Sequence, residues 1–265
     1  FSKVPHATSN TEMFESILYD HNYSDTTLLI KHRTKGSTIS LKELQSADNT
    51  GNIRIWPAEE VLAHFLVTSS FLKESTSKIS SDIVKMMEIG AGMSGLAGLS
   101  VMNQWKNVSQ LPLHLCITDG NDMCVESVAE IIDLNKQEGF IENGTSNVLQ
   151  SLVLPWESVV DILPDACGSL DFIIAADCVF LEQYHESLLQ MIDYLLSPSG
   201  TFVLMAPSRS GSRYRFKQNA EKEYSFQVTE TQHYCNIVWD KHVLLLDDLI
   251  THKYEPLNHY PSLLL

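Results

Sequence analysis

Three glycines that follow a short apolar stretch have the spacing in this chain that most directly indicates chemistry. Residues 83–87 predict a buried strand, and Gly90, Gly92 and Gly95 follow it in the pattern G-x-G-x-x-G. Glycine lets the backbone turn tightly and lets a ligand lie against it, because a Cβ atom there would clash. Apolar residues at helical spacing begin at Leu96, so free N–H groups of a helix are expected to face that ligand. The pattern predicts a nucleotide-binding strand, loop and helix.

Two acidic residues distinguish between the nucleotides that such a loop binds. Glu88 stands two residues before the first glycine, where a carboxylate suits an ammonium group and repels a pyrophosphate. S-adenosylmethionine (SAM) has that amino-acid end and no phosphate, so SAM is the expected ligand. Asp119 ends the next predicted strand, where a carboxylate accepts ribose hydroxyls, with Gly120 and Asn121 beside it. A nicotinamide dinucleotide, a turn that binds nothing, and a helix-capping role for Asp119 are the alternatives.

Another candidate carboxylate follows the predicted strand 170–176. Ala176 is small enough to keep the backbone close to a cofactor, and Asp177 then ends the strand, with Phe180 and Tyr184 shortly after it. Ligands of parallel α/β sheets bind beyond the carboxyl ends of the strands, where the strand order reverses. Asp177, Phe180 and Tyr184 are therefore the candidate catalytic residues, and a helix N-cap is the alternative role for Asp177.

Two tryptophans are candidates for contact with the cofactor. Trp156 follows the predicted strand 147–153, where an indole packs against an adenine. Trp56 precedes a predicted helix and touches the cofactor if that helix covers the pocket. For both side chains, ordinary packing is the alternative.

A basic run follows the last predicted strand of the alternating region. Arg209, Arg213, Arg215 and Lys217 are four of the 18 lysines and arginines of the chain. We expect them to form a rim that receives an acidic protein, and a solvated helix face is the alternative.

Composition and charge exclude several classes of function. The chain has 265 residues, 44% of them hydrophobic, and a formal net charge of −15, which argues against binding to nucleic acid or to an anionic membrane. No apolar run approaches the ~20 residues of a membrane span, and no signal peptide is visible. The five cysteines and ten histidines are scattered without metal-ligand spacing, so no metal and no disulfide framework are expected. We expect a reduced, monomeric protein of the cytoplasm, and also of the nucleus. The chain begins with Phe1 and not Met, so a native N-terminal segment is expected to precede it.

Strands alternate with helices from residue 83 onward, which predicts an α/β fold with a parallel sheet and helices on both faces. Residues 1–55 are predicted to be an N-terminal extension with a hairpin over 26–41, and residues 56–265 the main domain. Residues 69–82 are expected to form an exposed connection. Strands are predicted at 83–88, 113–118, 147–153, 170–176 and 201–206, with two more at 224–231 and 260–265. Helices are predicted at 57–66, 94–106, 121–138, 182–196 and 212–222.

Four sequence segments make the chain resemble a class I SAM-dependent methyltransferase of the family 16 protein-lysine group. The resemblance spans about 48–265 and is strongest to the calmodulin-lysine methyltransferases within that group. The segments that carry it are D-N-T-G-N at 48–52, I-W-P-A-E-E-V-L-A at 55–63, A-D-C-V-F-L-E-Q-Y at 176–184 and N-H-Y-P at 258–261.

The resemblance implies a Rossmann-like sheet of seven strands with the last strand antiparallel, and SAM as cofactor. It implies that Glu88, Gly90 and Gly92 hold the methionine end of SAM, and that Asp119 binds its ribose. The family's D-x-x-Tyr/Phe motif falls on Asp177 and Phe180, which would shape a lysine channel. Phe in place of Tyr is typical of the calmodulin-type members, so calmodulin is the implied substrate.

Other functions stay open at this point. The same motifs are compatible with three other functions: a family member that acts on another protein lysine, a non-catalytic SAM-fold interaction module, and a small-molecule methyltransferase. A nicotinamide-dependent oxidoreductase shares the glycine loop, although no Ser/Tyr-x-x-x-Lys constellation accompanies it. Residues 232–259 depart from the family pattern, and we expect them to bear on substrate recognition.

Overall fold

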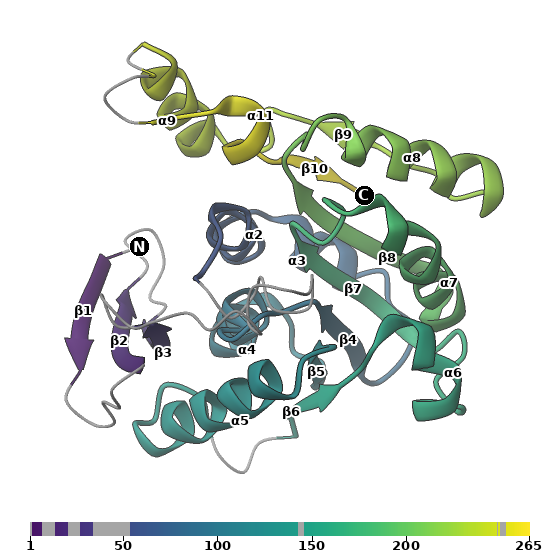
Figure 1. The fold of residues 1–265 in the computed structure, drawn as a ribbon. Helices are drawn as coiled ribbons and strands as arrows, with labels where there is room; N and C mark the ends of the chain where they lie inside the picture. Colours follow the sequence, from purple (N-terminus) through teal and green to yellow (C-terminus); the bar gives the residue numbers. More distant parts are fainter. Residues whose placement is uncertain are drawn as a thin grey trace.

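A seven-stranded sheet lies at the centre of the fold (Figure 1). The computed structural model describes residues 2–6, 14–20, 27–33, 54–142, 146–247, 249 and 253–265. The strands of the sheet are β4 (Val84–Ile89), β5 (Leu113–Asp119), β6 (Val148–Val153), β7 (Leu170–Ala176), β8 (Leu196–Ala206), β9 (Glu230–Thr231) and β10 (Ser262–Leu264).

The strand order is β6-β5-β4-β7-β8-β10-β9. Strands β4 to β8 run parallel, and β10 pairs antiparallel with both β8 and β9. The order reverses between β4 and β7, and the last strand of the chain is the antiparallel one. This topology confirms the predicted Rossmann-like methyltransferase fold.

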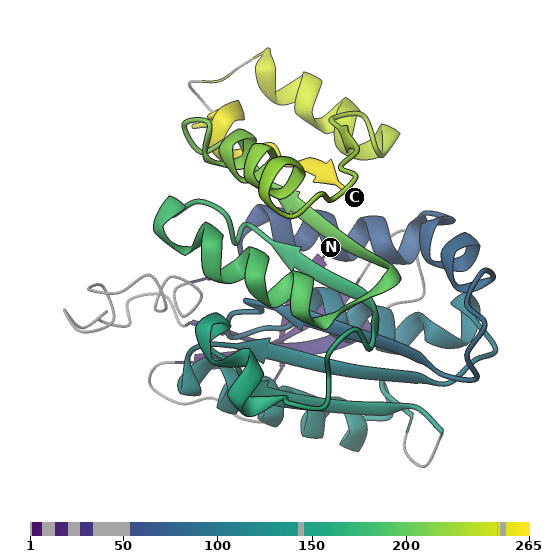
Figure 2. The same ribbon diagram turned by 90° about the vertical axis from the view of Figure 1, so that its right-hand side faces the viewer.

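Helices cover both faces of the sheet (Figures 1 and 2). One face packs against α2 (Pro57–Thr68), α4 (Leu96–Val108) and α5 (Asp122–Gln137). The other packs against α6 (Val159–Ile162), α7 (His185–Leu195) and α8 (Ser212–Glu223). Short 3-10 turns η2 (Trp156–Ser158) and η3 (Glu182–Tyr184) precede α6 and α7. Each face thus has its own apolar core, so the strands between them are nearly continuously apolar.

The predicted core strands are all present, and their observed ends lie within one residue of the prediction except in β8. That strand begins at Leu196, five residues before the predicted start, because Leu170 pairs with Leu196 and Phe172 with Thr201. The intervening residues 197–200 form an irregularity in the ladder. The sequence S-P-S-G at these positions hides the early start of the strand.

The predicted exposed connection over 69–82 is wrong for its first part, which contains helix α3 (Phe71–Thr76). Leu72 is fully buried, and the ring of Phe71 lies 5.6 Å from that of Phe65 and 6.3 Å from that of Phe172. The surrounding Ser, Lys and Thr residues mask this short apolar anchor in the sequence.

The predicted strand over 224–231 is reduced to the two residues of β9. The alternation of Tyr224, Phe226 and Val228 does bury one side of the segment, since all three pack against the core beneath α7 and α8. The Phe226 N–H donates to the Ala220 carbonyl, however, so this part of the backbone continues from α8 and joins no strand.

The predicted terminal strand over 260–265 is confirmed as β10. The segment 232–259 before it holds helices α9 (Asn236–Leu246) and α11 (Pro256–His259). No described helix is long and apolar enough to span a membrane.

Three antiparallel strands form a separate N-terminal sheet: β1 (Ser2–His6), β2 (Phe14–Asp20) and β3 (Thr27–Arg33). The predicted strand over 26–32 is confirmed as β3, and it pairs with β2. The rest of the predicted hairpin over 26–41 lies outside the described residues. Asn135 of α5 bonds the backbone N–H and carbonyl of Leu29, which attaches this sheet to the main fold. The division into residues 1–55 and 56–265 stays a prediction.

Candidate active site

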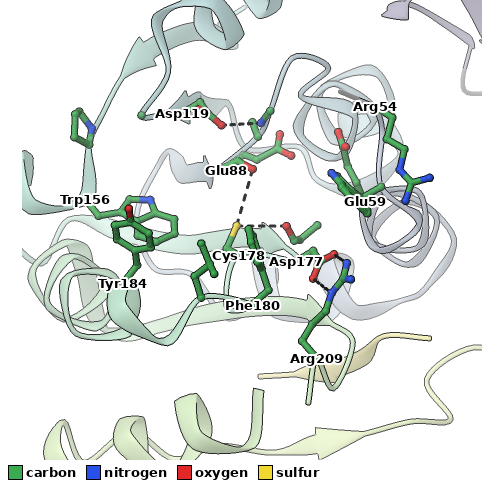
Figure 3. Close-up of a pocket in the computed structure, with 18 of the residues that line it drawn as sticks. Arg54, Glu59, Glu88, Asp119, Trp156, Asp177, Cys178, Phe180, Tyr184 and Arg209 are labelled. Atoms are coloured by element: carbon green, nitrogen blue, oxygen red, sulfur yellow. Dashed lines mark hydrogen bonds and ion pairs between the residues drawn. The ribbon is translucent and has the colours of Figure 1, made fainter. Parts of the chain in front are cut away.

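A cavity of about 380 Å³ opens beyond the carboxyl ends of the parallel strands (Figure 3). Elements between residues 54 and 209 converge there: the start of α2, the loops after β4 to β8, and η3. The cavity includes the point between β4 and β7 where the strand order reverses, which is where the sequence predicts the ligand. It is lined by Arg54, Trp56, Glu59, Glu88, Gly90, Ala91, Gly92, Asp119, Gly120, Pro155, Trp156, Glu157, Ala176, Asp177, Cys178, Phe180, Leu181, Tyr184 and Arg209.

The glycine loop takes the backbone conformation that its sequence predicts. Gly90, Gly92 and Gly95 have φ values of +59°, +60° and +54°, in the left-handed region that favours glycine. Gly90 is also constrained by space, because a Cβ atom on it would lie 2.6 Å from Cys178 Sγ. At Gly90 and Gly92 the loop therefore brings only backbone to this wall of the cavity.

Gly90→Ala is expected to destabilise the fold and to weaken binding of S-adenosylhomocysteine, measured by thermal unfolding and calorimetry. Gly139→Ala is the matched control, since Gly139 also has a positive φ but an added Cβ would meet nothing within 4 Å. The backbone cost of about 1–2 kcal/mol is common to both variants, and the clash adds about 1–3 kcal/mol to Gly90→Ala alone. Adding Cys178→Ala to Gly90→Ala should remove the clash and recover that part of the lost stability. The remaining Cβ of residue 178 lies 3.9 Å from the new methyl group. Equal losses in the two single variants would contradict this account.

The N-terminus of α4 does not present its N–H groups to the cavity, contrary to the sequence expectation. Glu59 accepts hydrogen bonds from the Leu96 N–H at 2.9 Å and from the Ser94 hydroxyl. Glu88 accepts from the Gly98 N–H at 2.8 Å. Two carboxylates of the protein thus occupy the positive end of the helix dipole, where a pyrophosphate would otherwise bind.

The described lining of the cavity is acidic, with five carboxylate side chains and two guanidinium groups. Glu88 is only 2% exposed, and burial, followed by the nearby Glu59 and Asp119 charges, raises the pKa of its carboxyl well above the ordinary value. The described lining therefore favours a positively charged ligand. The ammonium and sulfonium groups of SAM supply that charge, whereas a dinucleotide phosphate adds to the repulsion.

Asp119 ends β5 and is held by the backbone. Its Oδ2 accepts from the Gly92 N–H at 2.8 Å, and its Oδ1 from the Asn121 N–H at 2.9 Å. Asn121 itself does not line the cavity, because its side chain caps α5 by accepting from the Met123 N–H. Asp119 and Gly120 thus line the cavity, whereas Asn121 acts as a helix cap.

Aromatic rings form two sides of the cavity. Trp156 and Tyr184 stand edge to face with ring centroids 6.3 Å apart, and Trp156 lies beside Gly90. Trp56, the N-cap residue of α2, carries the guanidinium of Arg54 4.2 Å from its ring centroid. All four predicted aromatic residues, these three and Phe180, thus line the cavity and offer flat surfaces to a purine or to an alkyl chain.

The loop after β7 is held in a strained conformation. Asp177 has a φ of +54°, which is uncommon for a residue with a side chain. Its backbone N–H donates to the Met205 carbonyl at 2.8 Å, and two residues later the Val179 carbonyl accepts from Ser212 and lies 2.9 Å from His185 Nε2. These contacts from β8, α7 and α8 fix Asp177 at the cavity wall, where its side chain is 8% exposed.

The members of the basic run are all paired with carboxylates, and their role as a docking rim stays a prediction. Arg209 lines the cavity and pairs with Asp177. Arg213 is 11% exposed and bonds Glu230 at 3.0 Å and the Ala206 carbonyl. Arg215 bonds Glu182, and Lys217 bonds Glu230 at 3.3 Å. The run mainly fixes α8 to its neighbours, and Arg209 alone of the four faces the cavity.

Sequence reasoning missed several cavity residues. Glu59 has a sequence signal only as a helix-start acid, and its path to α4 depends on how α2 packs. Arg54 lies two residues before the predicted Trp56, and Cys178 directly follows the predicted Asp177. Their closeness in sequence to predicted site residues is the signal that could have identified them. Arg209 was predicted for a different surface.

A model of the lysine methyltransferase family matches residues 34–231, three quarters of the chain. The chain belongs to this family. Among similar proteins, the calmodulin-lysine N-methyltransferase of Arabidopsis thaliana is 28% identical, over 82% of this chain and 65% of its own length. Protein-lysine N-methyltransferase EFM2 of Saccharomyces cerevisiae is 28% identical, over 76% of this chain and 48% of its own length. Protein N-lysine methyltransferase METTL21A of Danio rerio is 28% identical, over 65% of this chain and 68% of its own length.

The chain thus spans less than two thirds of the length of the first two of these relatives. The cavity of this lysine methyltransferase family member fits SAM in charge and in the aromatic surfaces that it offers.

Proposed function

We propose that this chain is a SAM-dependent protein-lysine N-methyltransferase and that its substrate is calmodulin. The observation that carries the first part is the acidic cavity in which Glu59 and Glu88 cap α4, since it favours a cationic cofactor over a phosphate. The family match supports a lysine acceptor. The similarity to the Arabidopsis calmodulin-lysine N-methyltransferase and the Phe at position 180 support calmodulin. We expect the protein to act as a monomer in the cytoplasm and in the nucleus.

When bound, SAM supplies a methyl group already activated on a sulfonium. Glu88 would hold the ammonium of the methionine end, Gly90 and Gly92 would let that end lie against the backbone, and Asp119 would accept the ribose hydroxyls. Trp156 would pack against the base. The residues of the chain thus bind and orient the cofactor, and the chemistry needs no nucleophile from the protein.

The acceptor lysine must lose a proton before it can attack. At a pKa of about 10.4, only about 0.1% of a free lysine is neutral near pH 7.4, a deficit of about 4 kcal/mol. The ring of Phe180 makes the channel less favourable for an ammonium than water is. Asp177 would accept one N–H bond from the neutral amine and direct its lone pair. The proton leaves to water before the amine enters, so Asp177 has a positioning role.

The substrate assignment has a physical cost that local contacts must offset. Calmodulin is acidic and this chain has a net charge of −15, so long-range forces oppose their encounter. The other relatives are named as protein-lysine methyltransferases without calmodulin in the name. A different protein lysine is therefore the second candidate.

The test is transfer of labelled methyl from SAM to recombinant, unmethylated calmodulin, in parallel with a lysate from cells grown without methylation. We expect label on calmodulin and its loss with Asp177→Asn. Label on a different lysate protein alone would keep the methyltransferase and overturn the calmodulin assignment. SAM binding without transfer to any protein would overturn the proposed activity in favour of an interaction module. Labelled methyl on small molecules and on no protein would overturn the proposed protein-lysine acceptor.

A further inference from the structure

The acidic side chain at the end of β7 is not free to act as a lone carboxylate. Arg209 pairs with Asp177 through two contacts, from Nη2 to Oδ2 and from Nε to Oδ1, the second at 3.2 Å (Figure 3). Both side chains line the cavity, and they are 23% and 8% exposed. A two-point pair of this kind fixes the plane of the carboxylate as well as its charge.

Two further contacts and an unusual backbone conformation hold Arg209 in place. Its backbone has a φ of +46°, its N–H donates to the Leu257 carbonyl at 3.0 Å, and its guanidinium lies 5.4 Å from the Trp56 ring centroid. A strained and anchored backbone directs the side chain into the cavity, whereas Arg213, Arg215 and Lys217 pair with carboxylates outside it. A purely electrostatic surface role would not need this arrangement.

We propose that Arg209 is a positioning residue that keeps Asp177 paired, so that the channel takes the acceptor lysine as a neutral amine and not as an ammonium. The inference rests on the proposed lysine methyltransferase function. It gives Arg209 a role in selecting the reactive protonation state of the substrate.

The electrostatic reason is a competition for one carboxylate. An unpaired Asp177 would attract a lysine ammonium and hold it in its unreactive form, because opposite charges at short range favour the charged state. The paired carboxylate still has lone pairs for one N–H of a neutral amine, while the guanidinium beside it repels an ammonium. The other charged and titratable groups of the described lining are Arg54, Glu59, Glu88, Asp119, Glu157, Cys178 and Tyr184.

Those other groups do not replace the pair. Glu59, Glu88 and Asp119 accept hydrogen bonds from the α4 N-terminus and the glycine loop, on the side proposed for the cofactor. Cys178 is half-buried, and desolvation raises the pKa of its thiol, so it adds no charge near neutral pH. Asp177 is thus the carboxylate that an amine meets beside Phe180.

The first test uses n-butylamine as a probe of the lysine side chain, titrated by NMR into the protein saturated with S-adenosylhomocysteine between pH 7.5 and 9. An alkylamine with a pKa of about 10.4 becomes about tenfold more neutral with each pH unit in this range. The wild-type affinity for total butylamine should therefore rise about tenfold per unit. In Arg209→Gln the affinity should be nearly constant with pH, because the freed Asp177 binds the ammonium. Equal pH dependence in the two proteins would overturn the proposal.

Two matched variants separate charge from structure. Arg209→Lys keeps a cation beside Asp177 and should keep the wild-type pH dependence. The double variant Arg209→Gln with Asp177→Asn has no carboxylate at this position to trap an ammonium. Its butylamine affinity should regain the wild-type pH dependence. A structural defect in Arg209→Gln would lower affinity at every pH and leave the pH dependence unchanged, which counts against the proposal.

The second test is the pH dependence of kcat on the protein acceptor that the wild type labels. Arg209→Gln should lower kcat at least about 30-fold at pH 7.5, and kcat should then rise about tenfold per pH unit toward pH 9. Its KM should be lowered because the ammonium now binds. Parallel pH profiles would overturn the inference and leave the methyltransferase intact. Absence of labelling by the wild type would instead mark failure of the proposed function, and the butylamine titration would still decide the role of Arg209.

Discussion

Replacing Asp177 by Asn is expected to lower kcat for methyl transfer by about 100-fold, the cost of misplacing a reacting group by about 1 Å. Asn keeps the shape of Asp and tolerates the left-handed backbone that Asp177 adopts at φ +54°. It removes the charge that pairs with Arg209 and replaces one acceptor oxygen by a donor. The amine then loses its partner at the cavity wall, and Arg209 loses its anchor.

Affinity for S-adenosylhomocysteine should change by less than about twofold in the same variant, because the cofactor contacts lie on Glu88 and Asp119. Asp133→Asn is the matched control: Asp133 is exposed on α5, and its replacement should leave both kcat and affinity unchanged. Single-turnover kinetics and calorimetry make the two measurements. A collapse of cofactor affinity in Asp177→Asn with little change in kcat would place Asp177 in the cofactor site.

Replacing Glu88 by Gln should weaken SAM binding by about 10- to 100-fold, the usual loss of a hydrogen bond to a charged group. The amide oxygen can still accept from the Gly98 N–H, so the cap on α4 survives while the negative charge is lost. The same variant should raise the melting temperature of the unliganded protein above pH 7. Glu88 is buried close to Glu59 and Asp119, and removing its charge relieves their repulsion.

The pH dependence of these effects follows from the raised pKa of Glu88. Above the ordinary value of 4.5 and up to its raised value, the folded protein binds a proton that the unfolded chain has released. The stability of the unliganded protein therefore falls as pH rises through this window. SAM affinity changes in the opposite direction and rises with pH, because the ionised carboxylate is the form that binds an ammonium. Glu88→Gln should flatten both dependences.

Thermal unfolding and calorimetry across this pH range check both parts. Glu126→Gln is the control, since Glu126 is an exposed carboxylate on α5. Loss of stability together with loss of affinity in Glu88→Gln would mean that the charge supports the fold, and would refute the assignment of Glu88 to the cofactor.

The order of strands and helices and the position of the glycine loop were predictable from the sequence alone. Their signals are local: continuous apolar runs, helical spacing, and glycines where the backbone takes positive φ. The placement of Glu88, Asp119, Trp156 and Asp177 at one cavity follows from those signals, because the carboxyl ends of parallel strands meet at one edge of the sheet.

The short element α3 and the reduced strand β9 were not predictable in the same way. Each depends on whether a few apolar side chains find a partner: Leu72 does so within a polar stretch, and Phe226 does so without strand pairing. In both segments the secondary structure follows from which side chains are buried in the tertiary fold, and local composition indicates a different structure.

The chemical identity of the site was decided mainly by tertiary contacts between residues far apart in the sequence. Glu59 reaches the start of α4 across 37 residues, and Arg209 reaches Asp177 across 32. The sequence by itself determined a methyltransferase-like sheet with a nucleotide cavity. Only the tertiary structure decided that the helix end is closed to phosphate and that a basic residue expected on a docking rim lies in the cavity. Side-chain pairing over such separations depends on how helices and loops pack, and no local pattern encodes it.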